Sequence, residues 1–115
     1  MLRAPLALIA ACAALGAVAT SARAEMPYYD PNSYCRAVAS FGGAFSDSTM
    51  QTCLRMEQSA YDALKSRWDQ LPQHIRAYCD EVARFGGAGS YSTLETCVQM
   101  EIRAAQSNRA FKFKR

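Results

Sequence analysis

A 27-residue unit occurs twice in this chain, and this repeat constrains the fold more than any other feature of the sequence. Residues 34–60 align with residues 78–104 without a gap, at an offset of 44, and 16 of the 27 aligned positions are identical. Each copy carries two cysteines 18 residues apart, a Phe-Gly-Gly-Ala stretch between them, and one glutamate four residues after the second cysteine. Two copies of one unit predict two similar helical structures packed against each other.

The first 24 residues have the features of a secretory signal peptide. Arg3 supplies a short positive region, residues 5–20 are almost wholly apolar, and Ala22-Arg23-Ala24 fits the small-x-small cleavage pattern. We expect cleavage after Ala24, which leaves a mature chain of 91 residues in the periplasm or outside the cell. Ile9-Ala10-Ala11-Cys12 also resembles a lipobox, but too little apolar sequence precedes Cys12 for lipidation to be favoured.

Removal of the signal peptide changes the charge balance. The full chain has 13 basic and 10 acidic residues; two arginines leave with the signal, so 11 basic residues face 10 acidic ones. Three of these basic residues lie in the tail Phe111-Lys112-Phe113-Lys114-Arg115. The nearly neutral remainder does not support a nucleic-acid-binding surface. We expect the tail, residues 111–115, to be a frayed end, with weak contact to an anionic membrane surface as the alternative.

The helix signals of the mature chain predict four helices. Asp30 is a good N-cap for a helix that begins at Pro31, and Gly42-Gly43 supply the left-handed stop of that helix. Ser48 then begins a capping box for the next helix. The same three signals recur in the second repeat at Pro72, Gly86-Gly87 and Ser92.

Together these signals predict the fold class and the domain organisation. A mature chain of this length makes one small domain, which we place at residues 25–110. We expect an all-α fold of two helical hairpins, over about residues 30–69 and 72–109, each stapled by a disulfide.

The even number of cysteines left after cleavage predicts a disulfide framework. Four cysteines allow three connectivities, and the repeat favours Cys35 with Cys53 and Cys79 with Cys97, because antiparallel helices joined by a short loop bring these pairs to similar levels. Each bridge would stabilise the fold by about 3 kcal/mol in the chain-entropy view. There is no Cys-x-x-Cys motif, which argues against a zinc site and against a thioredoxin-like redox role.

Glu57 and its counterpart Glu101 lie where amphipathic helices should be apolar. On a helical wheel at 100° per residue, Glu57 falls near the centre of the apolar arc, between Leu64 and Trp68. Glu101 lies inside the equivalent arc of the second repeat. A carboxylate buried on such a face needs a hydrogen-bonding or ionic partner.

The hairpin geometry predicts a different partner for each glutamate. Glu57 should lie opposite the start of the first helix, around Asn32, where free backbone N–H groups and the helix dipole favour a negative charge. Glu101 should pair with Arg76. We interpret both carboxylates as structural ties. The alternatives are a shared groove that binds a cation or a basic peptide, and a pair of catalytic carboxylates.

Other reactive constellations are missing from the sequence. His74 is the only histidine, and it falls on the polar side of its helix. Without a second histidine we expect no metal cluster, and the sequence does not support a Ser-His-Asp or Cys-His arrangement. We expect no cofactor, no bound metal and no catalytic residue.

The stretch from Gly89 to Cys97, with Cys79 before it and Glu101 after it, resembles a module of small exported alphaproteobacterial proteins. These proteins carry Cys…Gly-Ser-Tyr…Cys…Glu repeats, and the resemblance covers residues 34–104. The first repeat departs from the pattern, with Phe45-Ser46-Asp47 in place of Gly89-Ser90-Tyr91. The resemblance implies export and implies no reaction.

The sequence is most consistent with a non-enzymatic binding or envelope-associated protein, whose protein or envelope partner is unknown. One alternative is an inhibitor or stress-type partner of an envelope enzyme. Another is a small hydrolase that uses Glu57 and Glu101. The hydrolase requires both carboxylates in one open cleft, so their exposure and placement discriminate between these hypotheses.

Overall fold

The computed structural model describes residues 2–5, 7, 10–11, 13–14, 16 and 24–115. Of the 24 residues of the expected signal peptide, 13 lie outside the described residues, and Cys12 and Ala22-Arg23 are among them. The described part contains four α-helices, one short 3₁₀-helix and no strand, which confirms the all-α fold class. None of the helices in this part is long and apolar enough to cross a membrane.

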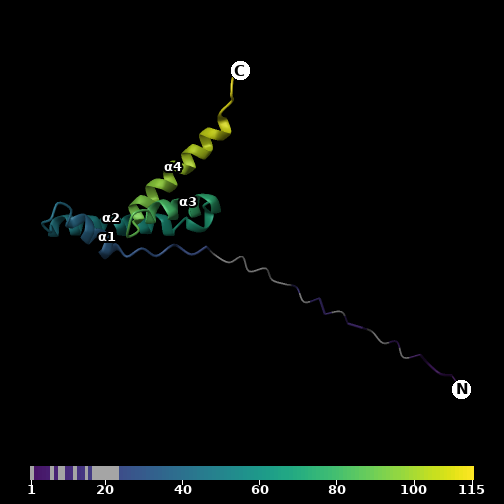
Figure 1. Cartoon of the computed structure of the whole chain (residues 1–115). Helices are drawn as coiled ribbons and strands as arrows, with labels where there is room; N and C mark the ends of the chain where they lie inside the picture. The colour runs from purple at the N-terminus through teal and green to yellow at the C-terminus, as the bar shows by residue number, and fades with distance from the viewer. Residues whose placement is uncertain (1, 6, 8–9, 12, 15, 17–23) are drawn as a thin grey trace.

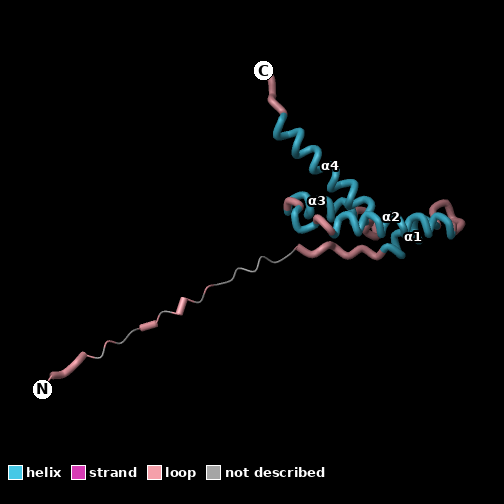
Figure 2. Tube along the Cα trace, turned by 180° about the vertical axis from the view of Figure 1, so that it is seen from behind, coloured by secondary structure: helices cyan, strands magenta, loops and turns pink. Residues whose placement is uncertain are grey.

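The four helices form two hairpins. Helices α1 (Pro31–Ala39) and α2 (Asp47–Lys65) make the first. Helices α3 (Gln73–Arg84) and α4 (Tyr91–Ala110) make the second, after the 3₁₀-helix η1 (Trp68–Gln70). Helices α2 and α4 pack against each other and so join the hairpins. The C-terminal half of α4 projects away from the rest of the fold, as Figures 1 and 2 show from opposite sides.

Both predicted disulfides are confirmed. Cys35 is bonded to Cys53 with the two Cα atoms 5.6 Å apart, and Cys79 is bonded to Cys97 with the Cα atoms 5.5 Å apart. Each bridge ties the two helices of one hairpin. Intramolecular disulfides of this kind are typical of proteins that mature outside the reducing cytoplasm.

The glycine pairs end the first helix of each hairpin, as expected. Gly42 and Gly43 have φ values of 89° and 108°, and Gly86 and Gly87 have φ values of 81° and 155°. These positive angles are cheap only for glycine. The pairs therefore allow each chain reversal within a short loop.

The second helix of each hairpin begins two residues earlier than the capping boxes at Ser48 and Ser92 predict. The true N-caps are Ser46 and Ser90, whose Oγ atoms each accept a 3.2 Å hydrogen bond from the backbone N–H three residues on. These two serines have the extended backbone of an N-cap, whereas Ser48 and Ser92 are already helical. As a result, Ser92 lies in the first turn of α4, where backbone N–H groups have no partner within the helix.

The hydrophobic core lies between the hairpins and is formed mainly by α2, α3 and α4. Helix α1 buries Cys35 and Ala39 but contributes no residue to the core cluster, and the Cys35–Cys53 bridge holds it against α2. The core cluster consists of Tyr29, Ala60, Leu64, Trp68, Leu71, Ile75, Cys79, Ala83, Tyr91, Leu94 and Val98.

The extended segment before α1 is part of the folded body. Tyr29 is only 2% exposed and belongs to the core. Trp68 donates a 2.9 Å hydrogen bond from Nε1 to the carbonyl of Glu25. The Tyr91 hydroxyl donates to the carbonyl of Pro27 and accepts from the backbone N–H of Tyr29, both at 2.9 Å. This segment therefore bridges the two hairpins.

Candidate functional site

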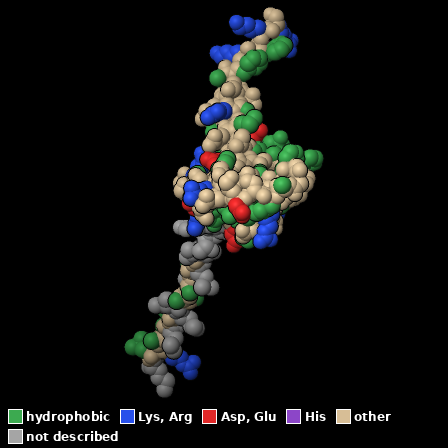
Figure 3. All heavy atoms as spheres, turned by 90° about the vertical axis from the view of Figure 1, so that its left-hand side faces the viewer, with side chains coloured by type: hydrophobic (Ala, Val, Ile, Leu, Met, Phe, Trp, Pro, Cys, Tyr) green, Lys and Arg blue, Asp and Glu red, His purple; other side chains and the backbone are tan. Residues whose placement is uncertain are grey.

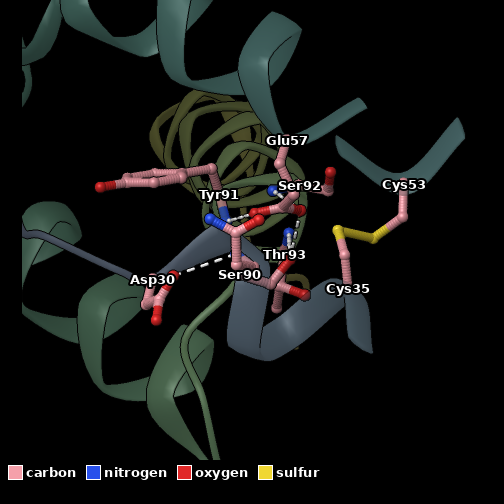
Figure 4. The surroundings of a disulfide bond; sticks show 9 residues. Asp30, Cys35, Cys53, Glu57, Ser90, Tyr91, Ser92 and Thr93 are labelled. Carbon is pink, nitrogen blue, oxygen red and sulfur yellow. Dashed lines mark hydrogen bonds between the residues drawn. A yellow bond between two sulfur atoms is a disulfide. The ribbon is translucent and has the colours of Figure 1, made fainter. Parts of the chain in front are cut away.

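Glu57 is a buried carboxylate at the junction of the two hairpins, with 1% of its surface exposed. Its two carboxylate oxygens accept three hydrogen bonds from the start of α4. The donors are Ser90 Oγ at 2.8 Å, the Tyr91 backbone N–H at 2.7 Å and the Ser92 backbone N–H at 3.2 Å (Figure 4). The predicted burial of Glu57 is confirmed.

The expected partner of Glu57 at Asn32 is wrong. The backbone N–H of Asn32 donates to Asp30 Oδ1 at 3.0 Å, so Asp30 already caps α1. Glu57 does meet the start of a helix, but the helix is α4 of the other hairpin. The prediction compared only the heights of residues on the two helices of one hairpin. In the structure α2 packs against α4 of the other hairpin, and Glu57 lies at that contact.

The Glu57 contact satisfies backbone groups that α4 cannot satisfy itself. The amides of Tyr91 and Ser92 lie in the first turn and have no carbonyl partner within the helix. A carboxylate there also interacts favourably with the positive end of the helix dipole. Glu57 is therefore a structural tie whose negative charge is matched by three donors, and it fixes α4 against α2.

Aromatic rings surround the other side of this junction. The Tyr91 ring is 4.7 Å from the ring of Tyr29 and 5.0 Å from that of Tyr61, measured between centroids. Gly89 lies directly beneath Tyr29, and a Cβ atom at Gly89 would stand 2.6 Å from Tyr29 Cγ. Only a residue without a side chain fits there. Burial raises the pKa of the Tyr91 hydroxyl.

Tyr29 also reaches the second hairpin through its hydroxyl group, which donates a 2.6 Å hydrogen bond to Asp80 Oδ1. The same oxygen accepts a 2.8 Å bond from Arg84 Nε, and the Arg84 guanidinium lies 4.9 Å from the centre of the Tyr29 ring. Burial, and then the hydrogen bond to Asp80, raise the pKa of Tyr29 well above its ordinary value. The lead-in segment is therefore fixed to α3 by a neutral hydroxyl.

Glu101 is partly exposed and does not pair with Arg76. Within residues 24–115, the ion pair that forms is that of Arg84 with Asp80. Arg76 lines a shallow pocket beside the lead-in segment, together with Asp80, whereas Glu101 shares a groove with Tyr78. Residues two apart on a helix point about 200° apart. Arg76 and Tyr78 therefore lie on opposite faces of α3, and the predicted Glu101–Arg76 pair is wrong.

Glu57 and Glu101 each lie in a groove between the two helices of their hairpin, and the two grooves have matching linings. Their volumes are about 340 Å³ and 390 Å³. The first groove is lined by Tyr34, Val38, Ser48, Thr49, Thr52, Cys53, Met56 and Glu57, and also by Ser92. The second is lined by Tyr78, Val82, Ser92, Thr93, Thr96, Cys97, Met100 and Glu101, which are the same eight positions of the repeat. Ser92 lines both grooves, so they adjoin at the start of α4.

Apolar side chains in these grooves are open to solvent. Met56 is 58% exposed, Met100 is 62% exposed and Tyr78 is 53% exposed. The helical wheel places Met56 and Met100 in the apolar arcs, but the buried face of α2 runs along Glu57, Ala60 and Leu64 and leaves Met56 at its edge. The exposed methionines therefore offer apolar surface to a ligand.

The residues that the structure describes assemble no metal site: no group of three or more histidine, cysteine or acidic side chains is placed to hold an ion. His74 is exposed, as expected. Both oxygens of Glu57 are occupied by hydrogen bonds, and Glu101 lies in a separate groove. The two carboxylates therefore do not share one open cleft.

The C-terminal tail is exposed at the end of the projecting helix. Phe111 is 71% exposed and Phe113 is 77% exposed. Figure 3 shows hydrophobic and basic side chains together at this end of the molecule. The tail lies apart from the grooves and makes no contribution to their lining.

The sequence-based predictions missed two residues of the junction, Tyr29 and Gly89. Tyr29 lies in a short segment with no periodicity, so nothing marks it as a core residue. Gly89 could have been found, because it is the one glycine of the second repeat that the first repeat replaces, with Phe45. That difference indicates a close approach specific to the second repeat.

No family model, no curated protein and no solved structure matches this chain. The resemblance to exported alphaproteobacterial repeat proteins therefore stays a prediction.

Proposed function

We propose that this chain is an exported, non-enzymatic binding protein that holds an apolar peptide segment of a partner protein along its two grooves. The observation that carries the proposal is the duplication of the groove lining, with a solvent-exposed methionine in each groove and Ser92 between them. One surface thus presents the same side chains twice. Such a surface suits a single ligand with two apolar anchors, since joining two weak contacts raises the overall affinity.

The walls of the grooves favour binding because they are rigid. Cys53 and Cys97 line the grooves, and their disulfides tie together the two helices on either side. A preorganised wall reduces the ordering cost of association. Met56 and Met100, in contrast, are flexible and polarisable and adapt to different apolar groups.

Export is supported by the two intramolecular disulfides, Cys35–Cys53 and Cys79–Cys97, because such bridges form and persist in oxidising compartments. We propose the periplasm or the cell exterior as the place where the protein acts.

A hydrolytic function is less well supported than binding. A catalytic carboxylate must reach substrate, whereas Glu57 is buried and fully hydrogen-bonded to α4. Inhibition of an envelope enzyme remains compatible with the grooves, because an inhibitor is a binding protein whose partner is an enzyme.

The proposal is tested with peptides selected from a random display library against the mature chain. With methyl-labelled methionine, a selected peptide should shift the NMR signals of Met56 and Met100 together and leave that of Met50 unchanged, since Met50 lines neither groove. Met56→Glu and Met100→Glu should each weaken binding by more than about 10-fold. Gln51→Glu, on the exposed side of α2, is the matched control. Peptides that bind with full affinity to both groove variants would contradict the proposal.

A further inference from the structure

We infer that the end of the second repeat binds the start of the first repeat in a second copy of this chain, with Glu101 in the role that Glu57 has within the chain. The template is the internal joint, where α2 carries a glutamate onto which the first turn of α4 docks. The repeat supplies both halves of that joint a second time, at the two ends of the molecule.

The first half is the free portion of α4. By the repeat offset, residues 101–110 of α4 correspond to residues 57–66, which are the C-terminal part of α2 and its C-cap and which receive the second hairpin. In α4 this portion projects from the fold beyond Ile102, which is partly buried against the core, and none of its residues is fully buried (Figure 1). Glu101 lies at its base, partly exposed, and forms no hydrogen bond or ion pair with the described residues. The acceptor position is therefore open.

The second half is the start of α2. Its N-cap Ser46 has φ and ψ of −117° and 115°, close to the −128° and 127° of Ser90 in the occupied joint. In both caps the serine Oγ accepts a 3.2 Å hydrogen bond from the backbone N–H three residues further along the chain. The backbone N–H groups of Asp47 and Ser48, which correspond to the two amides held by Glu57, meet no acceptor among the described residues. This turn therefore presents the donor set that Glu57 binds elsewhere.

The aromatic residues at the two ends are complementary. In the internal joint the Tyr29 ring covers Gly89, which leaves no room for a side chain. Around Glu101 no tyrosine takes that place, since the position that corresponds to Tyr29 is Gln73, the first residue of α3. The start of α2 instead carries Phe45 where α4 has Gly89, and Phe45 is 52% exposed. Phe45 thus offers one ring to the joint between copies, where the internal joint has the rings of Tyr29, Tyr61 and Tyr91.

The joint between copies should be weaker than the joint within the chain. Tyr61 and Leu64, which pack in the internal joint, correspond to Ala105 and Asn108 on α4. Less apolar area is buried, so association should be reversible and should depend on concentration. A head-to-tail contact of this type repeats from copy to copy and yields open chains unless the rotation closes a ring.

The test is sedimentation of the mature, oxidised chain over a concentration series, with two variants that block one end each. Glu101→Gln removes the charged acceptor. Asp47→Pro removes the donor amide at the first position of α2, where proline is favoured and where Ser46 already has the extended backbone that proline requires. We expect the average mass of the wild type to rise with concentration. Each variant alone should associate at least about 10-fold more weakly.

An equimolar mixture of the two variants gives the sharpest result. The Asp47→Pro chain keeps Glu101 and the Glu101→Gln chain keeps its α2 start, so the mixture should form dimers and nothing longer. Asp47→Ala keeps the amide and removes only a negative charge, so it should associate at least as well as the wild type. A wild type that stays monomeric at all concentrations, or association that survives both blocks, would overturn the inference. Because Ser48 and Glu101 also line the two grooves, peptide affinity is measured separately, on protein diluted until the wild type is monomeric.

Discussion

The carboxylate of Glu57 accepts a 2.7 Å hydrogen bond from the backbone N–H of Tyr91, and so a residue of one repeat caps a helix of the other. The N-cap Ser90 accepts a hydrogen bond from the amide of Thr93. Glu57 accepts hydrogen bonds from the two preceding amides, those of Tyr91 and Ser92. The start of α4 is therefore complete only when the first hairpin is in place. This shared cap explains why a charged residue is retained on the buried face of α2.

Glu57→Gln should destabilise the protein by about 2–4 kcal/mol, because an amide cannot match three donors and its own N–H₂ group would face backbone N–H groups. Glu101→Gln is the matched control from the second repeat, and it should change the free energy of unfolding of the monomer by less than about 0.5 kcal/mol. Chemical denaturation of dilute, oxidised protein measures both. If Glu57→Gln kept wild-type stability, the structural role of this carboxylate would be wrong.

Gly89→Ala should destabilise the fold through the Tyr29 ring and not through backbone strain. A Cβ atom at Gly89 would lie 2.6 Å from Tyr29 Cγ, and this glycine has no positive φ. We expect a loss of about 1–3 kcal/mol, as in other overpacked cores. In a Tyr29→Ala background the same substitution should cost much less, because the space is then open. A thermal-denaturation double-mutant cycle measures this coupling, and additive losses would show that the contact does not matter.

The two disulfides should have different consequences although both close loops of the same length. Removal of either bridge by paired alanines should cost about 3 kcal/mol from chain entropy. Without the Cys35–Cys53 bridge, α1 should open locally, since it adds no residue to the core cluster. Without the Cys79–Cys97 bridge, the whole core should weaken, since Cys79 is part of it.

Hydrogen exchange distinguishes these two cases. Replacement of Cys35 and Cys53 should remove the protection of amides in α1 and leave α4 protected. Replacement of Cys79 and Cys97 should lower protection throughout α2, α3 and α4. Equal loss over all helices in both variants would show that α1 is not a separate unit.

Stability should fall as the pH rises above about 10, the ordinary pKa of tyrosine. Burial and the hydrogen bond to Asp80 raise the pKa of Tyr29, so the unfolded chain loses that proton first and binds fewer protons than the folded chain in this range. The contribution is fully present below pH 10 and decreases above it. Urea denaturation at a series of pH values measures the slope.

Tyr29→Phe is the variant that isolates this effect. It should lower the neutral-pH stability by about 1 kcal/mol through the lost hydrogen bond and should reduce the alkaline slope. Tyr91, whose pKa is also raised by burial, should retain part of the slope. Tyr28→Phe, at an exposed position, serves as the control. An unchanged slope in Tyr29→Phe would contradict the assignment.

Much of the fold could be predicted from local sequence. The pairing of Cys35 with Cys53 follows from the repeat and from helix geometry, and the stops at Gly42 and Gly86 follow from a backbone conformation that glycine favours. The burial of Glu57 follows from its place on the helical wheel. Each of these inferences uses residues within one hairpin, where spacing along the chain determines spacing in the fold.

The contacts between hairpins could not be predicted in this way. The partner of Glu57 depends on the crossing of α2 and α4, which no spacing within a repeat specifies. The same is true of Tyr29, which finds Asp80 across 51 residues. Glu101 shows the converse, because an identical position in the repeat is partly exposed and, among residues 24–115, has no helix start packed onto it.

The contacts of the segment before α1 show that one sequence repeat is not one folding unit. The backbone of Tyr29 is bonded to the hydroxyl of Tyr91, and the carbonyl of Glu25 is bonded to Trp68. A nascent chain that stops before residue 91 has the complete first repeat. It still lacks the Tyr91 ring that packs against Tyr29 and the backbone amides that donate hydrogen bonds to Glu57. The first hairpin therefore reaches its final packing only after the start of the last helix has been synthesised.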